Sequence, residues 1–333
     1  MTRAAVVGAG SWGTTLANLL CGRGDAVTLW AFEPEVADEI NRRHRNDLFL
    51  PDAPLFPALR ATTDIGAALE GATLVVSAAP SHAVRRVMAA AAPQLGQGTI
   101  VVSASKGLEP DTHKRMTEVL EEVLPQKTAI AALSGPTFSR EVYERQPTAA
   151  VAASLDAGTA RRAQQAIGAP HFRLYTNDDL IGVELAGALK NVVAIAAGIL
   201  DGLGLGNNSR AALITRGLAE ITRLGVALGA RAATFAGLAG MGDLLMTATG
   251  PLSRNRSLGV EVGRGKPLEE ILARRLSVAE GVGTARAAVQ LAAQVGVELP
   301  IAREVVSVLF ERKAPRQAIG DLMERSLKSE TES

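Results

Sequence analysis

The sequence predicts an α/β fold in two parts: a doubly wound parallel sheet in residues 1–180 and an all-helical domain in residues 181–333. Three observations lead to this division. Short β-branched runs alternate with helical patterns through the first half, a glycine-rich stretch follows the first run, and the strand pattern stops at about Asp178. Alternating strands and helices are typical of doubly wound sheets, whereas helical spacing alone predicts a separate helical domain.

The predicted strands of the first half are continuous apolar runs with Gly or Pro at their ends. They are residues 4–7, 27–30, 73–79, 99–105, 128–133 and 148–154. Such runs suit parallel strands that are buried on both faces. Helical patterns such as Gly13–Gly22 and Ser81–Ala92 lie between them. We therefore expect crossover helices and a parallel sheet.

The second half shows helical patterns only. Its five predicted helices are residues 178–200, 209–229, 267–276, 283–296 and 301–311. In each of them the apolar residues recur at the spacing of one helix face. Since no strand pattern interrupts them, we predict an all-helical domain.

The composition restricts the classes of partner. A chain of 333 residues is long enough for two domains. Its formal net charge of +1 and its 3% of aromatic residues disfavour nucleic acid and an anionic membrane as partners. The chain also lacks a run of ~20 uninterrupted apolar residues, so we expect no membrane span.

Cysteine and histidine usage argues against a metal site. A single cysteine, Cys21, excludes an internal disulfide and a cysteine-based metal cluster. The four histidines, at positions 44, 82, 113 and 171, lack the spacing of zinc ligands. We therefore expect no metal and a reducing, cytoplasmic setting.

The stretch "VVGAGSWG" places Gly8, Gly10 and Gly13 in GxGxxG spacing, directly after a predicted strand and at the start of a predicted helix. Glycine allows the tight turn and the close approach of the backbone to a pyrophosphate, which then lies on the helix N-terminus. A glycine-rich turn without a ligand is the alternative. The surrounding βαβ pattern favours a dinucleotide-binding, Rossmann-type loop.

The choice between NAD and NADP stays open. After the second predicted strand, "AFEPE" brings Glu33 near the position where an acid binds the ribose 2′-hydroxyl of NAD. No Arg or Lys occupies residues 31–35, although Arg42 and Arg43 follow. Glu33 is equally consistent with an exposed loop acid before a helix-starting proline.

The stretch "LAGALKNVVAIAAGIL" carries one charge, Lys190, among apolar or small residues. A lysine there either extends its amine to water or serves a functional site. A carbonyl reductase needs a general acid, and the chain has no YxxxK pair and no prominent histidine to supply one. An apolar setting lowers the pKa of an ammonium group, which suits reversible proton transfer. Lys190 is therefore the candidate acid.

A second polar cluster lies in "GMGDLLMTATGPLSRNRSLG". Asp243 and Thr247 are four residues apart and share a helix face. At a predicted turn after Gly250–Pro251, "SRNR" gathers Ser253, Arg254, Asn255 and Arg256. Arg and Asn donors can bind a phosphate dianion. A solvated basic turn is the alternative for this segment.

Seven blocks together resemble a known family. They are "GAGSWGTTLA", "SASKGLE", "SGPTF", "GALKNVVAIAAGILDGLGLGNN", "AGMGDLLMT", "SRNR" and "VAEGVGTA". The sequence resembles bacterial NAD(P)-dependent glycerol-3-phosphate dehydrogenase over nearly its whole length. The resemblance implies a 6-phosphogluconate dehydrogenase-like fold and reversible reduction of dihydroxyacetone phosphate to sn-glycerol 3-phosphate with NAD or NADP. It further implies a cytoplasmic homodimer that supplies phospholipid synthesis.

The resemblance also implies site residues. Lys190 matches the catalytic proton donor and acceptor, and Asn191, Asp243 and Thr247 match its supporting polar residues. Lys106, the remaining implied catalytic residue, would lie at a strand end and reach both substrate and cofactor. The implied cofactor contacts are Gly8, Gly10, Ser11, Trp12, Gly13, Phe32, Lys106, Ser139, Arg254, Val278 and Glu280. The implied substrate contacts are Lys106, Gly135, Thr137, Lys190, Asp243, Ser253, Arg254 and Asn255.

One position departs from the family pattern. Relatives commonly carry Arg or His where this chain has Phe32, and that side chain helps to hold the adenosine end of the cofactor. The replacement weakens any transfer of an NADP preference to this chain.

Two other functions compete with this reading. The first is a related two-domain dehydrogenase. An enzyme that acts on a hydroxy acid would not need the phosphate-binding pair Arg254 and Asn255. An enzyme that oxidises a sugar nucleotide would need a nucleophilic cysteine, and Cys21 is poorly placed for that role. A non-catalytic NAD(P)-sensing protein would keep the fold without needing Lys190 and Asp243.

Overall fold

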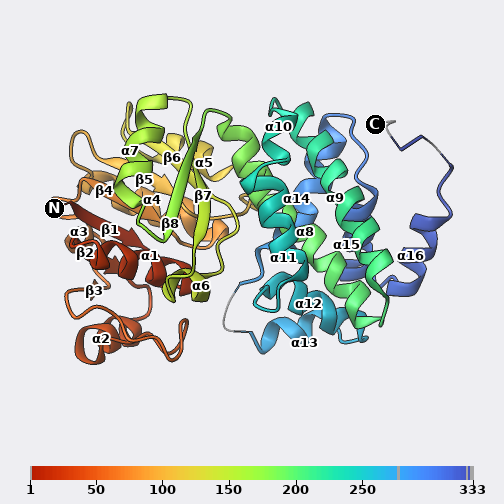
Figure 1. The fold of residues 1–333 in the computed structure, drawn as a ribbon, viewed down its shortest axis with the longest axis horizontal. Coiled ribbons are helices and arrows are strands. Elements are labelled where there is room, and N and C mark those ends of the chain that lie inside the picture. The colour runs from red at the N-terminus through yellow and green to blue at the C-terminus, as the bar shows by residue number, and fades with distance from the viewer. Residues whose placement is uncertain (1, 276–277, 328, 331–333) are drawn as a thin grey trace.

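The computed structural model describes residues 2–275, 278–327 and 329–330. A half built around a sheet lies beside a helical half, and the last helix, α16 (Pro315–Met323), lies at the end of the helical half away from the sheet (Figure 1). The chain passes between the halves where the last strand ends at Asn177 and the next helix begins at Leu180.

Within the described residues, eight strands form one sheet in the order β3-β2-β1-β4-β5-β6-β7-β8. Their bounds are β1 Arg3–Val7, β2 Ala26–Trp30, β3 Arg60–Thr62, β4 Leu74–Ser77, β5 Ile100–Ser103, β6 Ala129–Ser134, β7 Thr148–Ala153 and β8 Phe172–Asn177. The strand order reverses direction between β1 and β4, and ligands of doubly wound sheets bind at such a switch point, outside the carboxyl ends of the strands.

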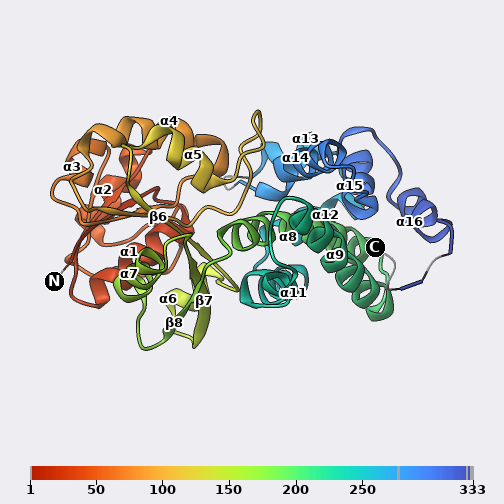
Figure 2. The same cartoon turned by 90° about the horizontal axis from the view of Figure 1, so that it is seen from above.

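Helices cover both faces of this sheet. Their bounds are α1 Ser11–Gly22, α2 Pro34–Arg43, α3 Ile65–Leu69, α4 Val84–Ala91, α5 Met116–Val123, α6 Ser139–Tyr143 and α7 Ala157–Ile167, with short 3-10 turns η1 Ser81–Ala83 and η2 Ala92–Gln94. Figure 2 shows α3, α4 and α5 on one side of the sheet and α1 and α7 on the other. Successive residues of β1 alternate between the two cores, with Val6 in one and Val7 in the other.

The helical half is arranged around one long central helix, α8 Leu180–Gly202. Its other elements are α9 Asn207–Ala227, α10 Ala232–Phe235, the π-helical turn η3 Leu238–Gly242, α11 Asp243–Thr249, α12 Arg254–Gly263, α13 Leu268–Ala273, α14 Glu280–Gln294, α15 Pro300–Phe310 and α16 Pro315–Met323. By length and composition α8 could cross a membrane, but 83% of its most apolar stretch is buried inside the protein. It is the core helix of this half.

Helices α8 and α12 approach until their backbones touch. A Cβ added to Gly198 or Gly259 would lie 2.0 or 2.1 Å from a carbonyl oxygen of the opposite helix. One turn on, Gly202 and Gly263 repeat this reciprocal approach at 2.4 Å each. Any side chain at these four positions would force the helices apart.

The predicted fold class is confirmed, and the six predicted strands correspond to β1, β2, β4, β5, β6 and β7 within two residues at each end. The sequence patterns miss β3, which has three residues, and the edge strand β8, where exposed residues interrupt the apolar run. The predicted helix 267–276 is α13, and its expected last residue, Leu276, lies outside the described residues. The predicted helix Ser81–Ala92 begins instead as the 3-10 turn η1.

The expected parallel sheet contains one antiparallel pair among the described strands. Strands β6 and β7 are antiparallel. The segment that joins β6 to β7 stays at the carboxyl end of β6, where Thr137 and Ser139 line a cavity. Strand β7 therefore starts beside the end of β6 and runs back along it in the opposite direction. A parallel pairing would require the chain to return to the opposite edge first.

Candidate functional site

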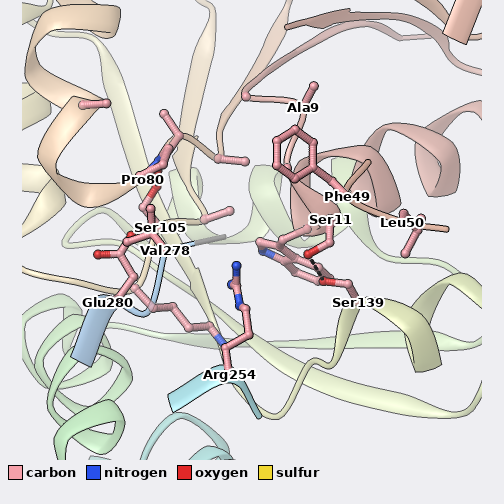
Figure 3. A pocket seen from close by; sticks show the side chains of 18 of the residues that line it. Ala9, Ser11, Phe49, Leu50, Pro80, Ser105, Ser139, Arg254, Val278 and Glu280 are labelled. Atoms are coloured by element: carbon pink, nitrogen blue, oxygen red, sulfur yellow. Dashed lines mark hydrogen bonds between the residues drawn. The ribbon is translucent and has the colours of Figure 1, made fainter. Parts of the chain in front are cut away.

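A cavity of about 790 Å³ lies between the two halves, outside the carboxyl ends of the central strands. The glycine loop lines it on the sheet side, and α8, α12 and the start of α14 line it on the helical side. Figure 3 shows Ser11 and Ser139 on one wall, Glu280 and Val278 on the other, and the Arg254 side chain reaching between them.

The glycine loop is built for close backbone contact. Gly8 has a φ of +116°, and a Cβ there would lie 2.8 Å from the backbone nitrogen of Ala79 at the end of β4. A Cβ on Gly13 would lie 1.8 Å from the carbonyl oxygen of Gly8. No other atom of the described residues lies within 4 Å of a Cβ placed on Gly10, which faces open space at the N-terminus of α1. The loop therefore fits a dinucleotide pyrophosphate.

Two side chains beside the glycine loop, Trp12 and Ser139, have polar atoms that are free or weakly bonded in the described part of the chain. The indole Nε1 of Trp12 is buried without a hydrogen-bond partner among the described residues. The hydroxyl of Ser139 donates to that of Ser11 over 3.4 Å, a long bond that a ligand oxygen could replace. Both features suit a polar ligand in the cavity.

The residues that follow β2, Phe32 and Glu33, form the far end of the cavity. Phe32 is 67% exposed and meets Trp30 edge-on, with ring centroids 6.4 Å apart. Glu33 lines the cavity and also precedes the first helical residue, Pro34, so both sequence interpretations of this acid agree with its position. A ribose and an apolar ring fit this wall, whereas a 2′-phosphate would meet the Glu33 carboxylate.

At the inner end of the cavity two lysines share one carboxylate. The Lys190 Nζ donates to Asp243 Oδ1 over 2.9 Å and to Thr247 Oγ1 over 2.6 Å. The Lys106 Nζ donates to Asp243 Oδ2 over 2.9 Å and to the carbonyl oxygen of Gly135 over 2.7 Å, with Thr137 Oγ1 at 3.2 Å. Asp243 is fully buried behind the two amines. The cluster has two cations and one anion.

Burial determines how these groups titrate. Desolvation, with a smaller contribution from the charge of Lys106, lowers the pKa of Lys190 to about 8 against the opposing effect of Asp243. Burial alone would raise the pKa of Asp243, but Lys106 and Lys190 hold it below its ordinary value. The carboxyl group therefore stays ionised while Lys190 can exchange a proton near neutral pH.

Two buried asparagines connect the elements around this cluster. Asn191 donates through Nδ2 to the carbonyl oxygen of Lys106 over 3.2 Å. Asn255 donates to Asn191 Oδ1 over 2.9 Å and accepts from the backbone nitrogen of Gly281 over 3.0 Å. The chain of amides joins the end of β5 to α8, α12 and α14, so it fixes the shape of the inner wall.

The predicted turn at residues 253–256 is the start of a helix. Ser253 caps α12, and its hydroxyl accepts from the backbone nitrogen of Arg256 over 3.2 Å. The Arg254 guanidinium points into the cavity and forms no hydrogen bond or ion pair with another described residue. The surrounding walls lower its pKa by desolvation, with the Glu280 charge opposing this. An anion in the cavity would supply its missing partner.

Most of the sequence-predicted site residues lie together. The cavity wall includes Gly8, Gly10, Ser11, Trp12, Phe32, Lys106, Thr137, Ser139, Lys190, Asn191, Thr247, Ser253, Arg254, Asn255, Val278 and Glu280. Gly13, Gly135 and Asp243 lie behind the wall and act through the residues that they contact.

Sequence reasoning missed several wall residues, among them Phe49, Pro80 and Arg275. Pro80 directly follows the predicted strand 73–79, so its place at a carboxyl end was a usable signal. Phe49 lies in an irregular loop and Arg275 after a short helix, where no pattern marks them. Arg275 donates to the carbonyl oxygen of Arg254 over 2.9 Å and thereby supports the start of α12. Among the described residues, no group of three or more His, Cys, Asp and Glu side chains could hold a metal ion.

The comparisons with known proteins identify the family. A family model for the N-terminus of NAD-dependent glycerol-3-phosphate dehydrogenase matches residues 3–160, and the C-terminal model matches residues 179–320. The chain belongs to the NAD-dependent glycerol-3-phosphate dehydrogenase family. The family confirms the predicted enzyme class and a nicotinamide cofactor, NAD or NADP.

Relatives of this glycerol-3-phosphate dehydrogenase family resemble the whole chain. A protein of Citrifermentans bemidjiense named glycerol-3-phosphate dehydrogenase (NAD(P)+) is 54% identical over 328 residues, which cover 98% of each chain. The crystal structure of glycerol-3-phosphate dehydrogenase from Coxiella burnetii is 38% identical with a TM-score of 0.93, over 97% of this chain and 99% of that one. A ketopantoate reductase from Ralstonia eutropha, at 17% identity and a TM-score of 0.62, over 96% of this chain and all of that one, shares the fold alone.

Proposed function

We propose that the chain interconverts dihydroxyacetone phosphate and sn-glycerol 3-phosphate, with Lys190 as general acid in reduction and general base in oxidation. The observation that carries this proposal is the buried amine of Lys190, whose pKa of about 8 places both protonation states within reach at the inner end of the cavity. A snorkelling lysine would hold its amine in water, but Lys190 is only 5% exposed.

The neighbours of Lys190 support proton transfer in both directions. Asp243 and Thr247 fix the amine by hydrogen bonds, so its remaining N–H can point to a carbonyl oxygen in the cavity. Lys106 adds a second positive charge near the place where an alkoxide develops, which stabilises that charge. NADH or NADPH, held by the glycine loop, would supply the hydride.

The other end of the substrate is matched to Arg254. Its guanidinium has no partner within the described part of the chain and can bind a phosphate dianion with two parallel bonds. Ser253 and Asn255 lie beside it, although the Asn255 amide already binds Asn191 and the Gly281 backbone. The substrate we propose therefore carries its phosphate at Arg254 and its carbonyl at Lys190.

A turnover assay tests this function. The purified protein is mixed with NADH or NADPH and dihydroxyacetone phosphate, and the loss of nicotinamide absorbance is followed. Oxidation of the cofactor with this substrate, and none with 2-keto acids, would support the proposal. Turnover of 2-keto acids instead would indicate a hydroxy-acid dehydrogenase, and cofactor binding without turnover would indicate a sensing protein.

The family resemblance also supports a cellular role, which we include in the proposal. Glycerol 3-phosphate made by this reaction would supply the backbone of phospholipids, and a homodimer in the cytoplasm would make it. Light scattering on the purified chain tests the dimer by its mass. Depletion of the chain in cells should lower the pool of glycerol 3-phosphate, and an unchanged pool would contradict the role.

A further inference from the structure

Two carboxylates of the helical half each bind one residue of the sheet half in the same manner. Glu280 accepts from the backbone nitrogen of Ser81 over 3.0 Å and from its hydroxyl. Glu184 accepts from the backbone nitrogen of Thr117 over 2.9 Å and from its hydroxyl. Glu280 lines the cavity, but Glu184 does not, so no role in ligand binding accounts for Glu184.

Glu184 forms a buried charge pair across the two halves. The Arg115 Nη1 lies 2.7 Å from Glu184 Oε2, and the two side chains are 15% and 7% exposed. Burial raises the pKa of Glu184, while Arg115 and Thr117 oppose that rise. Thr117 lies in the first turn of α5, where a carboxylate satisfies free backbone N–H groups. We name this contact, made by Glu184, Arg115 and Thr117, the Glu184 bridge.

On one face of α8, three contacts with the sheet half lie beside the apolar packing of Leu180 and Val183 against β6 and β7. The first of the three is the Glu184 bridge. Gly187 lies against the end of β6, where a Cβ would come within 2.6 Å of Ser134 Oγ. Asn191 donates to the carbonyl oxygen of Lys106. Residues 184, 187 and 191 follow helical spacing and share this face. The bridge is the only charged contact of the three.

The position of α8 matters because the two lysines of the inner cluster belong to different halves. Lys190 and Asp243 come from α8 and α11, whereas Lys106 follows β5. Both amines bind the same carboxylate over 2.9 Å, which requires the halves to be registered within a few tenths of an ångström. A shift of the helical half relative to the sheet half would lengthen the contact between Lys106 and Asp243.

We propose that Glu184 is a positioning residue for the reaction: its bridge to Thr117 and Arg115 holds α8 in register with the sheet half, and thereby Lys190 with Lys106. This proposal deepens the proposed function and rests on it. Glu184 touches neither substrate nor cofactor and acts through the placement of the helix that carries Lys190.

The first test is Glu184→Ala, assayed well below its unfolding temperature. We expect kcat to fall by about 10- to 100-fold, since misplacing reacting groups by about 1 Å costs up to about that much. Cofactor affinity, measured by fluorescence titration, should change by less than about threefold because the glycine loop is untouched. A kcat within about twofold of the parent would overturn the proposal and leave Glu184 as a structural cap.

A matched control separates position from stability. Glu220, on α9, also caps a helix N-terminus with its carboxylate, binding the backbone nitrogens of Ile301 and Ala302 over 2.9 Å, but this contact lies within the helical half. Glu220→Ala should lose stability in a comparable way and keep its kcat. An equal loss of kcat in both variants would show general loosening and contradict the proposal.

Two milder variants, both at Thr117, test the proposal if Glu184→Ala does not fold. Thr117→Val removes only the hydroxyl that donates to Glu184, whereas Thr117→Ser keeps it. We expect Thr117→Val to lower kcat by at least about threefold and Thr117→Ser to restore the parent value. Equal kcat in all three proteins would refute the positioning role.

A readout without turnover distinguishes this proposal from the proposed function. The rate at which formaldehyde and a borohydride methylate Lys190, followed by mass spectrometry against pH, reports its titration. The charged groups that face this amine are Asp243 on α11, Lys106 after β5 and Arg254 on α12. If Glu184→Ala releases Lys106 from the cluster, a repelling charge is lost and the curve shifts to higher pH.

The methylation result stands even if dihydroxyacetone phosphate is not a substrate. In that case the parent protein shows no turnover and the proposed reaction is refuted. A shift of the Lys190 curve in Glu184→Ala, absent in Glu220→Ala, would still support the bridge. Identical curves for parent and Glu184→Ala would overturn it.

Discussion

Arg254→Ala tests whether the start of α12 binds the substrate phosphate. The guanidinium has no partner among the described residues, so its loss leaves protein contacts intact and removes only what it gives to a ligand. Truncating one partner of a close charge pair costs about 2–5 kcal/mol. Because Arg254 is open to the solvent of the cavity, water will replace part of the interaction, and we expect about 2–3 kcal/mol. This corresponds to a loss of roughly 30- to 150-fold in kcat/KM.

The assay compares two substrates for each protein. Steady-state kinetics with dihydroxyacetone phosphate should show the full loss, while unphosphorylated dihydroxyacetone, a poor substrate for either protein, should lose little. Arg264→Ala, at the exposed far end of α12, removes the same charge away from the cavity and should match the parent. Equal losses on both substrates would refute phosphate binding and assign the effect to the cofactor or the fold. No loss on either would make Arg254 an ordinary surface residue.

Three further predictions follow from the site and its surroundings. Lys190→Met removes the proton donor, so kcat should fall at least ~10²-fold. Cofactor affinity, measured by fluorescence titration, should change little. A retained kcat would contradict the role of Lys190 as general acid. With Phe32 and Glu33 at the adenosine end, kcat/KM for NADPH should exceed that for NADH by less than ~100-fold, and a larger ratio would refute the reasoning. Burial raises the pKa of Glu220 from 4.5 to about 7. The folded chain therefore holds this proton more tightly, and stability should fall by about 3 kcal/mol as pH rises from about 4.5 to about 7. Urea denaturation of Glu220→Gln should lack that fall, and an unchanged pH dependence would refute the assignment.

The sequence was most informative where one local pattern determines structure. Apolar runs with glycine ends predicted six strands because central parallel strands are buried on both faces. Strand β8 was not predicted, because it lies at the edge of the sheet and its alternate residues are exposed to solvent, so it has no continuous apolar run. The antiparallel pairing of β6 and β7 was not predicted, because no local sequence pattern shows to which end of the sheet a connecting segment returns.

The site divides in the same way. GxGxxG spacing and the isolated Lys190 were visible because each breaks the pattern of its surroundings. The sharing of Asp243 by Lys106 and Lys190 could not be predicted from spacing, since the residues are separated by up to 137 positions and meet only when two halves pack together. For the same reason Glu184 looked like an ordinary helix residue, and only its contact with Thr117 reveals its partner.

The glycine contacts between α8 and α12 have a consequence for how this enzyme can evolve. Lys190 lies on one of these helices and Arg254 begins the other, so their spacing is determined by touching backbones rather than by side chains that could change size. Substitution can enlarge this spacing but cannot shorten it. A lineage that adapts to a shorter substrate must therefore change the groups that protrude into the cavity. At Gly198, Gly202, Gly259 and Gly263, any larger residue would instead push α8 and α12 apart.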